Sequence, residues 1–143
     1  MKKIIFTLLA LVLVVGFTFG QAKKSHKGKL DRKTYVLSVL PDGKKKANID
    51  ELKFVSGTLD SKMMTDDGFK AASYDATVDS SANPPEISFT CTASDDKEGT
   101  YEWTGKVTGD DIEGSGKLTT KKGKTKKSFT FSGTLKGKKE PKQ

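Results

Sequence analysis

The feature that most constrains the fold of this chain is a strict alternation of apolar and polar residues between positions 100 and 135. The alternation runs through three segments that are joined by two short turns. A repeat of two residues with one apolar face is typical of half-buried antiparallel strands. The segments therefore predict a β-meander with one face turned to water. Its inward residues are Tyr101, Trp103, Gly105, Val107, Ile112, Gly114, Gly116, Leu118, Phe129, Phe131, Gly133 and Leu135.

The stretches before this meander carry weaker versions of the same pattern. Alternation recurs across residues 35–39, 74–78 and 87–93, and a longer strand is expected across residues 49–59. In that longer strand Leu59 is out of phase with Phe54, and the Gly57 between them indicates a bulge or bend. Residues 61–68 are irregular and predict a short helical turn. Its Met63 and Met64 either plug one end of a barrel or line a ligand entrance, and plugging is the commoner role.

The connections between these segments are short, which favours antiparallel pairing of strands that follow one another in the chain. The pattern gives seven strands, or eight if the stretch 49–59 is broken at Gly57. Strands in this number close into a small barrel, because closure removes the exposed edges of the sheet. An immunoglobulin-like sandwich is the rival fold, but it lacks the long crossing connections and the Cys…Trp…Cys pattern. The expected class is all-β, an antiparallel up-and-down meander of 7–8 strands closing into a small barrel.

The first 22 residues have the parts of a secretory signal peptide. Two lysines precede an apolar run over residues 4–15, and small residues follow, with cleavage after Gly20 or Ala22. The run is short for a membrane span, so none is expected after cleavage. We therefore expect a secreted or periplasmic protein. Residues 23–29 would form a basic flexible tail, residues 30–137 the barrel domain, and residues 138–143 a second basic flexible tail.

The composition argues against an enzyme and against a metal protein. Cys91 is the only cysteine, which excludes an intramolecular disulfide, and it lies on a predicted apolar face as a small core residue. His26, the only histidine, falls in the basic tail, so no nucleophile–base pair or metal-ligand set is formed. Three Asp-Asp pairs lie at predicted turns and match no calcium-loop spacing. No catalytic residue, metal or cofactor is expected, and the protein is expected to be a monomer.

A resemblance to a known family rests on three stretches of this sequence. The leader KLDRKTYVL at residues 29–37 resembles the opening of lipocalin-type barrels. The stretch WTGKVTGDDIEGSGKL at residues 103–118 and the stretch FTFSGTL at residues 129–135 resemble the closing strands of lipocalin-like (calycin) barrels in small exported bacterial proteins. This resemblance implies a small, mostly apolar ligand bound inside the barrel.

The inward aromatic residues are the candidate lining of such a pocket. A barrel of eight strands is close to the size at which side chains either fill the interior or leave room for one small ligand. The hydroxyls of inward tyrosines need partners, and inward glycines would leave space, both of which favour a pocket. The alternative is a filled core that serves as a scaffold. The candidate pocket residues are Tyr35, Phe54, Tyr74, Phe89, Tyr101, Trp103, Phe129 and Phe131.

The charge is divided along the chain into basic ends and an acidic middle. Residues 21–46 carry nine basic and two acidic residues, residues 47–116 carry five and fifteen, and residues 117–143 carry ten and one. In a closed barrel the two basic ends become neighbours and would form a face for an anionic surface or polymer. Aromatic residues do not interleave with these lysines, so nucleic acid is not an expected partner. The candidate residues of this face are Lys121, Lys122, Lys124, Lys126 and Lys127.

Two hypotheses of different classes follow. In the first, the protein is a non-enzymatic carrier or sensor of a small hydrophobic or amphipathic ligand held inside the barrel. In the second, it is an envelope or surface scaffold with a filled core, which contacts an anionic partner through its basic face.

Overall fold

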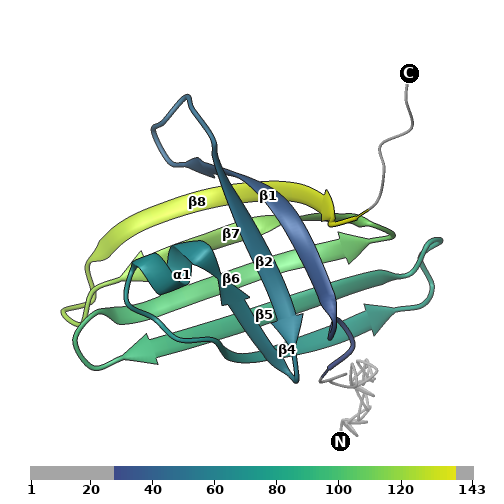
Figure 1. The fold of residues 1–143 in the computed structure, drawn as a ribbon, viewed down its shortest axis with the longest axis horizontal. Coiled ribbons are helices and arrows are strands. Elements are labelled where there is room, and N and C mark those ends of the chain that lie inside the picture. Colours follow the sequence, from purple (N-terminus) through teal and green to yellow (C-terminus); the bar gives the residue numbers. More distant parts are fainter. Residues whose placement is uncertain (1–27, 138–143) are drawn as a thin grey trace, which may run out of the picture.

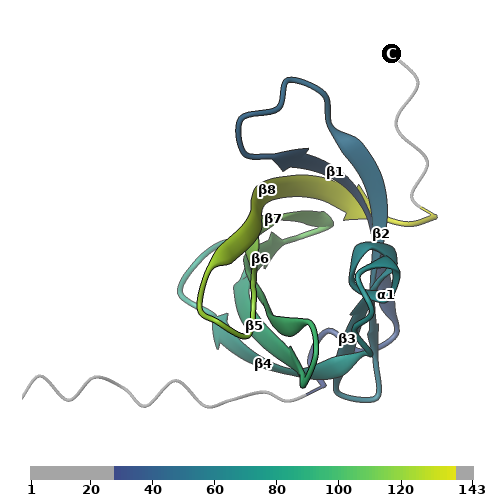
Figure 2. The same ribbon diagram turned by 90° about the vertical axis from the view of Figure 1, so that its left-hand side faces the viewer.

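The computed structural model describes residues 28–137, and in this range the chain forms eight strands and one short helix. Each strand pairs antiparallel with its neighbour in the chain, and β8 pairs with β1 to close a barrel (Figures 1 and 2). The predicted all-β up-and-down barrel is therefore confirmed. The elements are β1 (Lys33–Pro41), β2 (Asn48–Val55), β3 (Thr58–Ser61), α1 (Lys62–Asp66), β4 (Ala72–Asp79), β5 (Glu86–Asp95), β6 (Gly99–Thr108), β7 (Asp111–Thr119) and β8 (Thr125–Leu135).

The apolar side chains meet inside the barrel because every second residue of each strand points inward. In β6, for example, Tyr101, Trp103 and Val107 are buried while Thr104 and Lys106 are exposed. Fully burying one large apolar side chain stabilises a fold by about 1.5–3 kcal/mol, so this interior supplies most of the driving force for folding. The predicted signal peptide and the two predicted terminal tails, except Gly28 and Lys29, lie outside the described residues. Those two residues belong to an ordered turn, in which the Asp31 N–H donates to the Gly28 carbonyl at 3.0 Å.

The stretch predicted as one bent strand is in fact a tight hairpin. β2 and β3 are joined by Ser56 and Gly57, whose φ angles are 49° and 77°. Positive φ at both central residues is the geometry of a two-residue hairpin turn, which glycine adopts without steric strain. Phe54 then pairs with Leu59 across the hairpin, and this reversal explains why their alternation is out of phase. The break at Gly57 makes the strand count eight.

A short leader before β1 closes one end of the barrel. Leu30 is fully buried there, and its N–H donates to the hydroxyl of Tyr74 at 3.0 Å. That hydroxyl donates in turn to a carboxylate oxygen of Asp31 at 2.8 Å. Asp31 also accepts from the N–H of Gly57 at 2.9 and 3.1 Å. Hydrogen bonds therefore tie the leader both to β4 and to the β2–β3 turn.

The helix α1 lies at the opposite end, which faces the viewer in Figure 2. The predicted helical turn over residues 61–68 is thus present. Met64 is fully buried, Met63 is partly buried against the core, and Phe69, just after the helix, is 3% exposed. The two methionines therefore pack at the barrel end as a plug, as their sequence position suggested.

Candidate functional site

The barrel interior gathers all of the candidate pocket residues into one aromatic cluster. Each of the eight side chains is at most 4% exposed. The rings of Tyr101 and Trp103 are stacked with centroids 5.9 Å apart, and Phe129 and Phe131 lie against Trp103 with centroids at 5.0 and 5.3 Å. A second group joins Phe54 edge-on to Tyr35, Tyr74 and Phe89. The sequence therefore identified the members of the interior.

The expectation that the inward glycines leave space is wrong. A Cβ atom on Gly105 would lie 2.7 Å from the ring of Phe89, its partner on the neighbouring strand. The ring of Phe131 would lie equally close to a Cβ on Gly114, and the ring of Phe129 would lie even closer to a Cβ on Gly116. Side chains at these positions would collide with the rings. Each glycine is thus covered by a neighbour's phenylalanine, and the middle of the barrel is filled.

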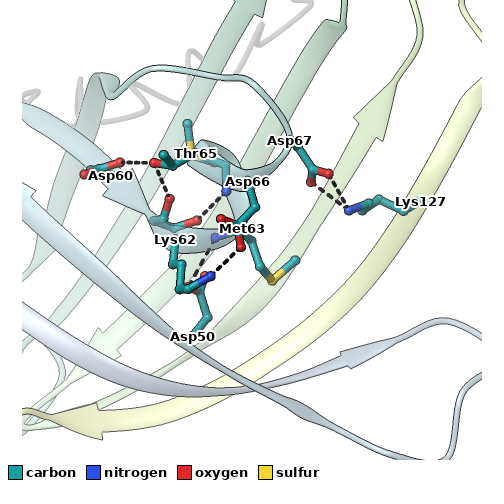
Figure 3. A network of polar contacts seen from close by, with 10 residues as sticks. Asp50, Asp60, Lys62, Met63, Thr65, Asp66, Asp67 and Lys127 are labelled. Carbon is teal, nitrogen blue, oxygen red and sulfur yellow. Dashed lines mark hydrogen bonds and ion pairs between the residues drawn. The ribbon is translucent and has the colours of Figure 1, made fainter.

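At the α1 end the interior also contains polar groups. Asp50 points inward from β2 and is only 2% exposed. One of its carboxylate oxygens accepts from the N–H of Met63 at 3.3 Å, in the first turn of α1 (Figure 3). Burial raises the pKa of Asp50, and hydrogen bonds from Glu51, Ser61 and α1 partly oppose this effect. The other carboxylate oxygen is buried without a hydrogen-bond partner among the described residues.

Two further polar groups, both on β6, are buried in the barrel interior. The hydroxyl of Tyr101 and the indole N–H of Trp103 are both buried and make no hydrogen bond of ordinary length. Burial raises the pKa of Tyr101, and the charge of Asp67, a weak hydrogen bond to Asp67 and the charge of Asp50 raise it further. Buried polar groups in folded proteins are nearly always well paired, so three buried atoms without a hydrogen bond of ordinary length need an explanation.

The tyrosines nearer the leader end differ from one another. Burial and the hydrogen bond to Asp31 raise the pKa of Tyr74 to about 12, and its hydroxyl has two partners. Burial, together with the charge of Asp110, raises the pKa of Tyr35 to about 12. The hydroxyl of Tyr35 is buried without a partner in the described residues, so it is a single isolated group rather than part of a cluster.

An ion pair fastens the C-terminal side of α1 to the barrel wall. The ammonium group of Lys127 on β8 lies 2.7 and 2.9 Å from the two carboxylate oxygens of Asp67 (Figure 3). Lys127 was predicted to belong to the basic face, but this contact turns it toward α1 and leaves its side chain 37% exposed. Its pairing partner is 60 residues away in the chain, so local sequence contains no signal for it.

The remaining predicted lysines are exposed on and beside the β7–β8 hairpin. Lys121, Lys122, Lys124 and Lys126 form no ion pair within the described chain. The β1–β2 hairpin adds Lys44, Lys45 and Lys46, which are likewise exposed and unpaired there. The strands β1 and β8 that lead into the two hairpins pair side by side, and the Asp42 N–H donates to the Ser128 carbonyl at 2.9 Å.

One hollow lies on the outer wall of the barrel and not inside it. Its volume is about 870 Å³, and it extends beside the β1–β2 hairpin across the outer faces of β4 to β8. Serine and threonine are the most frequent lining residues because the outward positions of these strands are rich in them, while apolar atoms make up most of the lining surface. Thr90, Thr104, Ser115 and Thr130 are successive cross-strand partners in one row. The lining side chains include Ser38, Leu40, Lys45, Ala47, Asp75, Thr77, Ser88, Thr90, Thr104, Lys106, Glu113, Ser115, Thr130 and Ser132.

The described residues contain little that resembles catalytic machinery. Cys91 is 3% exposed, and burial, together with the charge of Asp75, raises its pKa to about 12, so the thiol is a poor nucleophile. Residues 28–137 hold no group of three or more histidine, cysteine or acidic side chains placed to bind a metal ion. In the same range there is no helix of sufficient length and apolarity to cross a membrane.

Sequence reasoning missed Asp50, although a signal for it was present. Asp50 has the same parity on β2 as the inward Leu52 and Phe54, so alternation alone places its carboxyl group inside. Alternation in the sequence shows which serine and threonine side chains point outward. It does not show that they form one continuous row, because the row depends on the register between strands. Comparisons with protein-family models, curated proteins and solved structures find no match for this chain, so its function is argued from its own geometry.

Proposed function

We propose that this protein is an exported, non-enzymatic binding protein that contacts an anionic polysaccharide through its outer wall. The observation that carries the proposal is the position of the hollow of about 870 Å³, outside the barrel and beside a hairpin with three unpaired lysines. The filled middle of the barrel supports the same assignment, since the aromatic interior is already occupied by its own side chains.

The lysines of the two hairpins supply attraction for negative charge. Seven exposed ammonium groups stand on Lys44–Lys46 and on Lys121, Lys122, Lys124 and Lys126, and none of them is paired to a carboxylate within residues 28–137. Exposed charges that are not neutralised by neighbours attract an anionic polymer over a distance of about 8–10 Å at physiological salt. Binding through this surface should therefore weaken as salt is added.

The hydroxyl rows favour a polysaccharide among anionic polymers. Within a row, neighbouring strands place Thr90, Thr104, Ser115 and Thr130 at intervals of about 4.8 Å. These hydroxyls make no hydrogen bond to the described part of the chain, and each is able both to donate and to accept. Sugar hydroxyls have the same double capacity. Leu40, which is 40% exposed at the edge of the hollow, offers a small apolar contact.

The test is binding of the mature protein to immobilised dextran sulfate, with neutral dextran alongside, at salt concentrations from about 0.05 to 0.5 M. We expect retention on dextran sulfate that falls as salt rises. The variant Lys121→Ala/Lys122→Ala should weaken binding about fivefold, which corresponds to two exposed ion pairs. Lys70→Ala/Lys97→Ala removes the same charge near Asp95 and is the matched control. Binding that is indifferent to salt, or equal losses in both variants, would contradict the proposal.

The hydroxyl contribution is tested separately by Thr104→Val/Thr130→Val, which keeps the shape of both side chains. This variant should lower affinity for dextran sulfate by a further few-fold without changing the salt dependence. A second function, binding of a small ligand inside the barrel, is favoured by the three unpaired polar atoms at the α1 end. It is also what the resemblance to lipocalin-like barrels implies.

A further inference from the structure

The helix α1 is attached to the barrel by its two methionines and by several polar contacts. Of its five residues only Met64 is buried. Ser61 caps the helix by accepting from the N–H of Met64 at 3.0 Å, and Asp50 accepts from the N–H of Met63. A helix of this length has no stability of its own in water, so it depends on these contacts. Breaking a few polar contacts would release it without opening the strand ladder.

The ion pair between Asp67 and Lys127 is the contact that joins α1 to the far wall. Figure 3 shows Lys127 reaching from β8 toward Asp67, on the side of the helix away from Asp50. The helix is thus held at its start by β2 and β3 and just after its end by β8. This arrangement is that of a cover hinged on one wall and fastened to the other.

Three buried polar atoms of the barrel interior make no hydrogen bond of ordinary length. The indole N–H of Trp103 is a donor, the free carboxylate oxygen of Asp50 is an acceptor, and the hydroxyl of Tyr101 is both. Trp103 and Tyr101 stand two residues apart on β6 with stacked rings, so they belong to one wall. A ligand head group that both accepts and donates hydrogen bonds would complete this set.

We infer that α1 is a movable cover over a binding site inside the barrel, which takes a small amphipathic molecule with an uncharged hydroxyl head group. The apolar part of the ligand would occupy the volume that Met64 and Phe69 fill when the cover is closed. Phe69 now lies edge-on against Tyr101, with ring centroids 5.3 Å apart, and would leave with the cover. A carboxylate head group is disfavoured, because Asp50 and Asp67 both lie near Tyr101. This site is separate from the outer wall and does not depend on the polysaccharide proposal.

Movement of the cover is measured with Trp103, the only tryptophan of the chain. Lys127→Ala and Asp67→Asn should each raise acrylamide quenching of Trp103 and speed hydrogen exchange in residues 61–69, while exchange in β5 to β7 stays slow. The charge-swapped double variant Asp67→Lys/Lys127→Asp should restore the wild-type values. Lys117→Ala breaks an ion pair of 3.1 Å to Glu102 on the outer face and is the matched control. If quenching in the first two variants equals that of Lys117→Ala, α1 is not a cover.

The ligand is tested with 1-decanol, followed by the fluorescence of Trp103, with decanoate as the charged counterpart. Decanol should give a saturable change of one molecule per protein, and Lys127→Ala should bind it several-fold more tightly because more of the protein is open. Tyr101→Phe should weaken binding about tenfold through loss of the hydroxyl. Absence of saturable decanol binding in both wild type and Lys127→Ala overturns the site, as does an undiminished affinity in Tyr101→Phe. Retention on dextran sulfate is expected to be the same for the wild type, Lys127→Ala and Tyr101→Phe.

Discussion

The two ends of the barrel are closed by different means, and two tyrosines show the difference. At the leader end the hydroxyl of Tyr74 donates to Asp31 and accepts from the N–H of Leu30. At the α1 end the hydroxyl of Tyr101 is equally buried but makes no hydrogen bond of ordinary length, only a weak one to Asp67. A fold selected for stability alone would pair both groups. The leader end is therefore closed by well-paired polar groups, whereas the α1 end keeps buried polar groups that a ligand is able to bind.

The leader and α1, which plug the two ends of the barrel, are also attached to it by different contacts. The leader follows directly into β1, and its Asp31 binds the β2–β3 turn through both carboxylate oxygens. The helix α1 depends on its Ser61 cap, on Asp50 and on one ion pair to Lys127. Elements with few buried apolar contacts open locally at lower free energy than the elements of the core. The α1 end is thus the end at which the interior becomes accessible first.

The largest expected difference comes from shortening the main apolar side chain of each plug. Leu30→Ala should lower the free energy of unfolding by about 3–4 kcal/mol, because the leader has no alternative position. Met64→Ala should lower it by only about 1–2 kcal/mol, since a plug that opens locally contributes less to global stability. Urea denaturation followed by Trp103 fluorescence measures both values. Equal losses would mean that the two ends are equally rigid.

The second comparison removes one oxygen atom from each tyrosine. Tyr74→Phe should destabilise the protein by about 1.5–3 kcal/mol, because Asp31 and the Leu30 N–H then lose a partner. Tyr101→Phe should leave stability unchanged or raise it by up to about 1 kcal/mol, because an unpaired buried hydroxyl is removed. Thermal and urea unfolding of the two variants give the comparison directly. A loss in Tyr101→Phe as large as in Tyr74→Phe would show that its hydroxyl has a stabilising partner.

The smallest expected effect is a pH dependence that arises from Asp50 alone. Its pKa in the folded state is raised above the ordinary value of 3.8, so the folded protein binds the proton more tightly than the unfolded chain. Its contribution to stability is therefore most favourable below pH 3.8 and is lost as the pH rises through the raised pKa. Lys62 on α1, the hydroxyl of Ser61 on β3 and Tyr101 on β6 are the groups around it.

Asp50→Asn isolates this contribution because asparagine does not titrate. Relative to wild type, the variant should gain stability between about pH 4 and pH 7, with the difference largest at the upper end. Unfolding midpoints measured across this range for both proteins give the difference, and the titrations of all other groups cancel. A difference that stays constant with pH would mean that the pKa of Asp50 is not raised.

Much of the fold followed from the sequence because alternation is a local property. The inward faces of β4 to β8 and the short helix were predictable from residues close to one another in the chain. The hairpin at Ser56 and Gly57 was seen only as an irregularity, since a change of phase indicates a break without saying whether the chain bends or reverses. The candidate site was less accessible, because Asp50, Tyr101 and Lys127 come from three distant strands.

The sequence by itself determined nearly all of the side chains that enter the barrel and limited its wall to seven or eight strands, because the two-residue period and the turn residues act within a few positions. Only the tertiary structure decided what those side chains meet. The register between strands lays Phe129 over Gly116 and Phe89 over Gly105, which fills the interior that the glycines had suggested was open. Barrel closure also brings Lys127 to Asp67. It gives the hydroxyl of Tyr74 a close hydrogen-bond partner in Asp31, whereas the hydroxyl of Tyr101 has no hydrogen bond of ordinary length. Such differences depend on strand stagger and on contacts across the barrel, which no local pattern encodes.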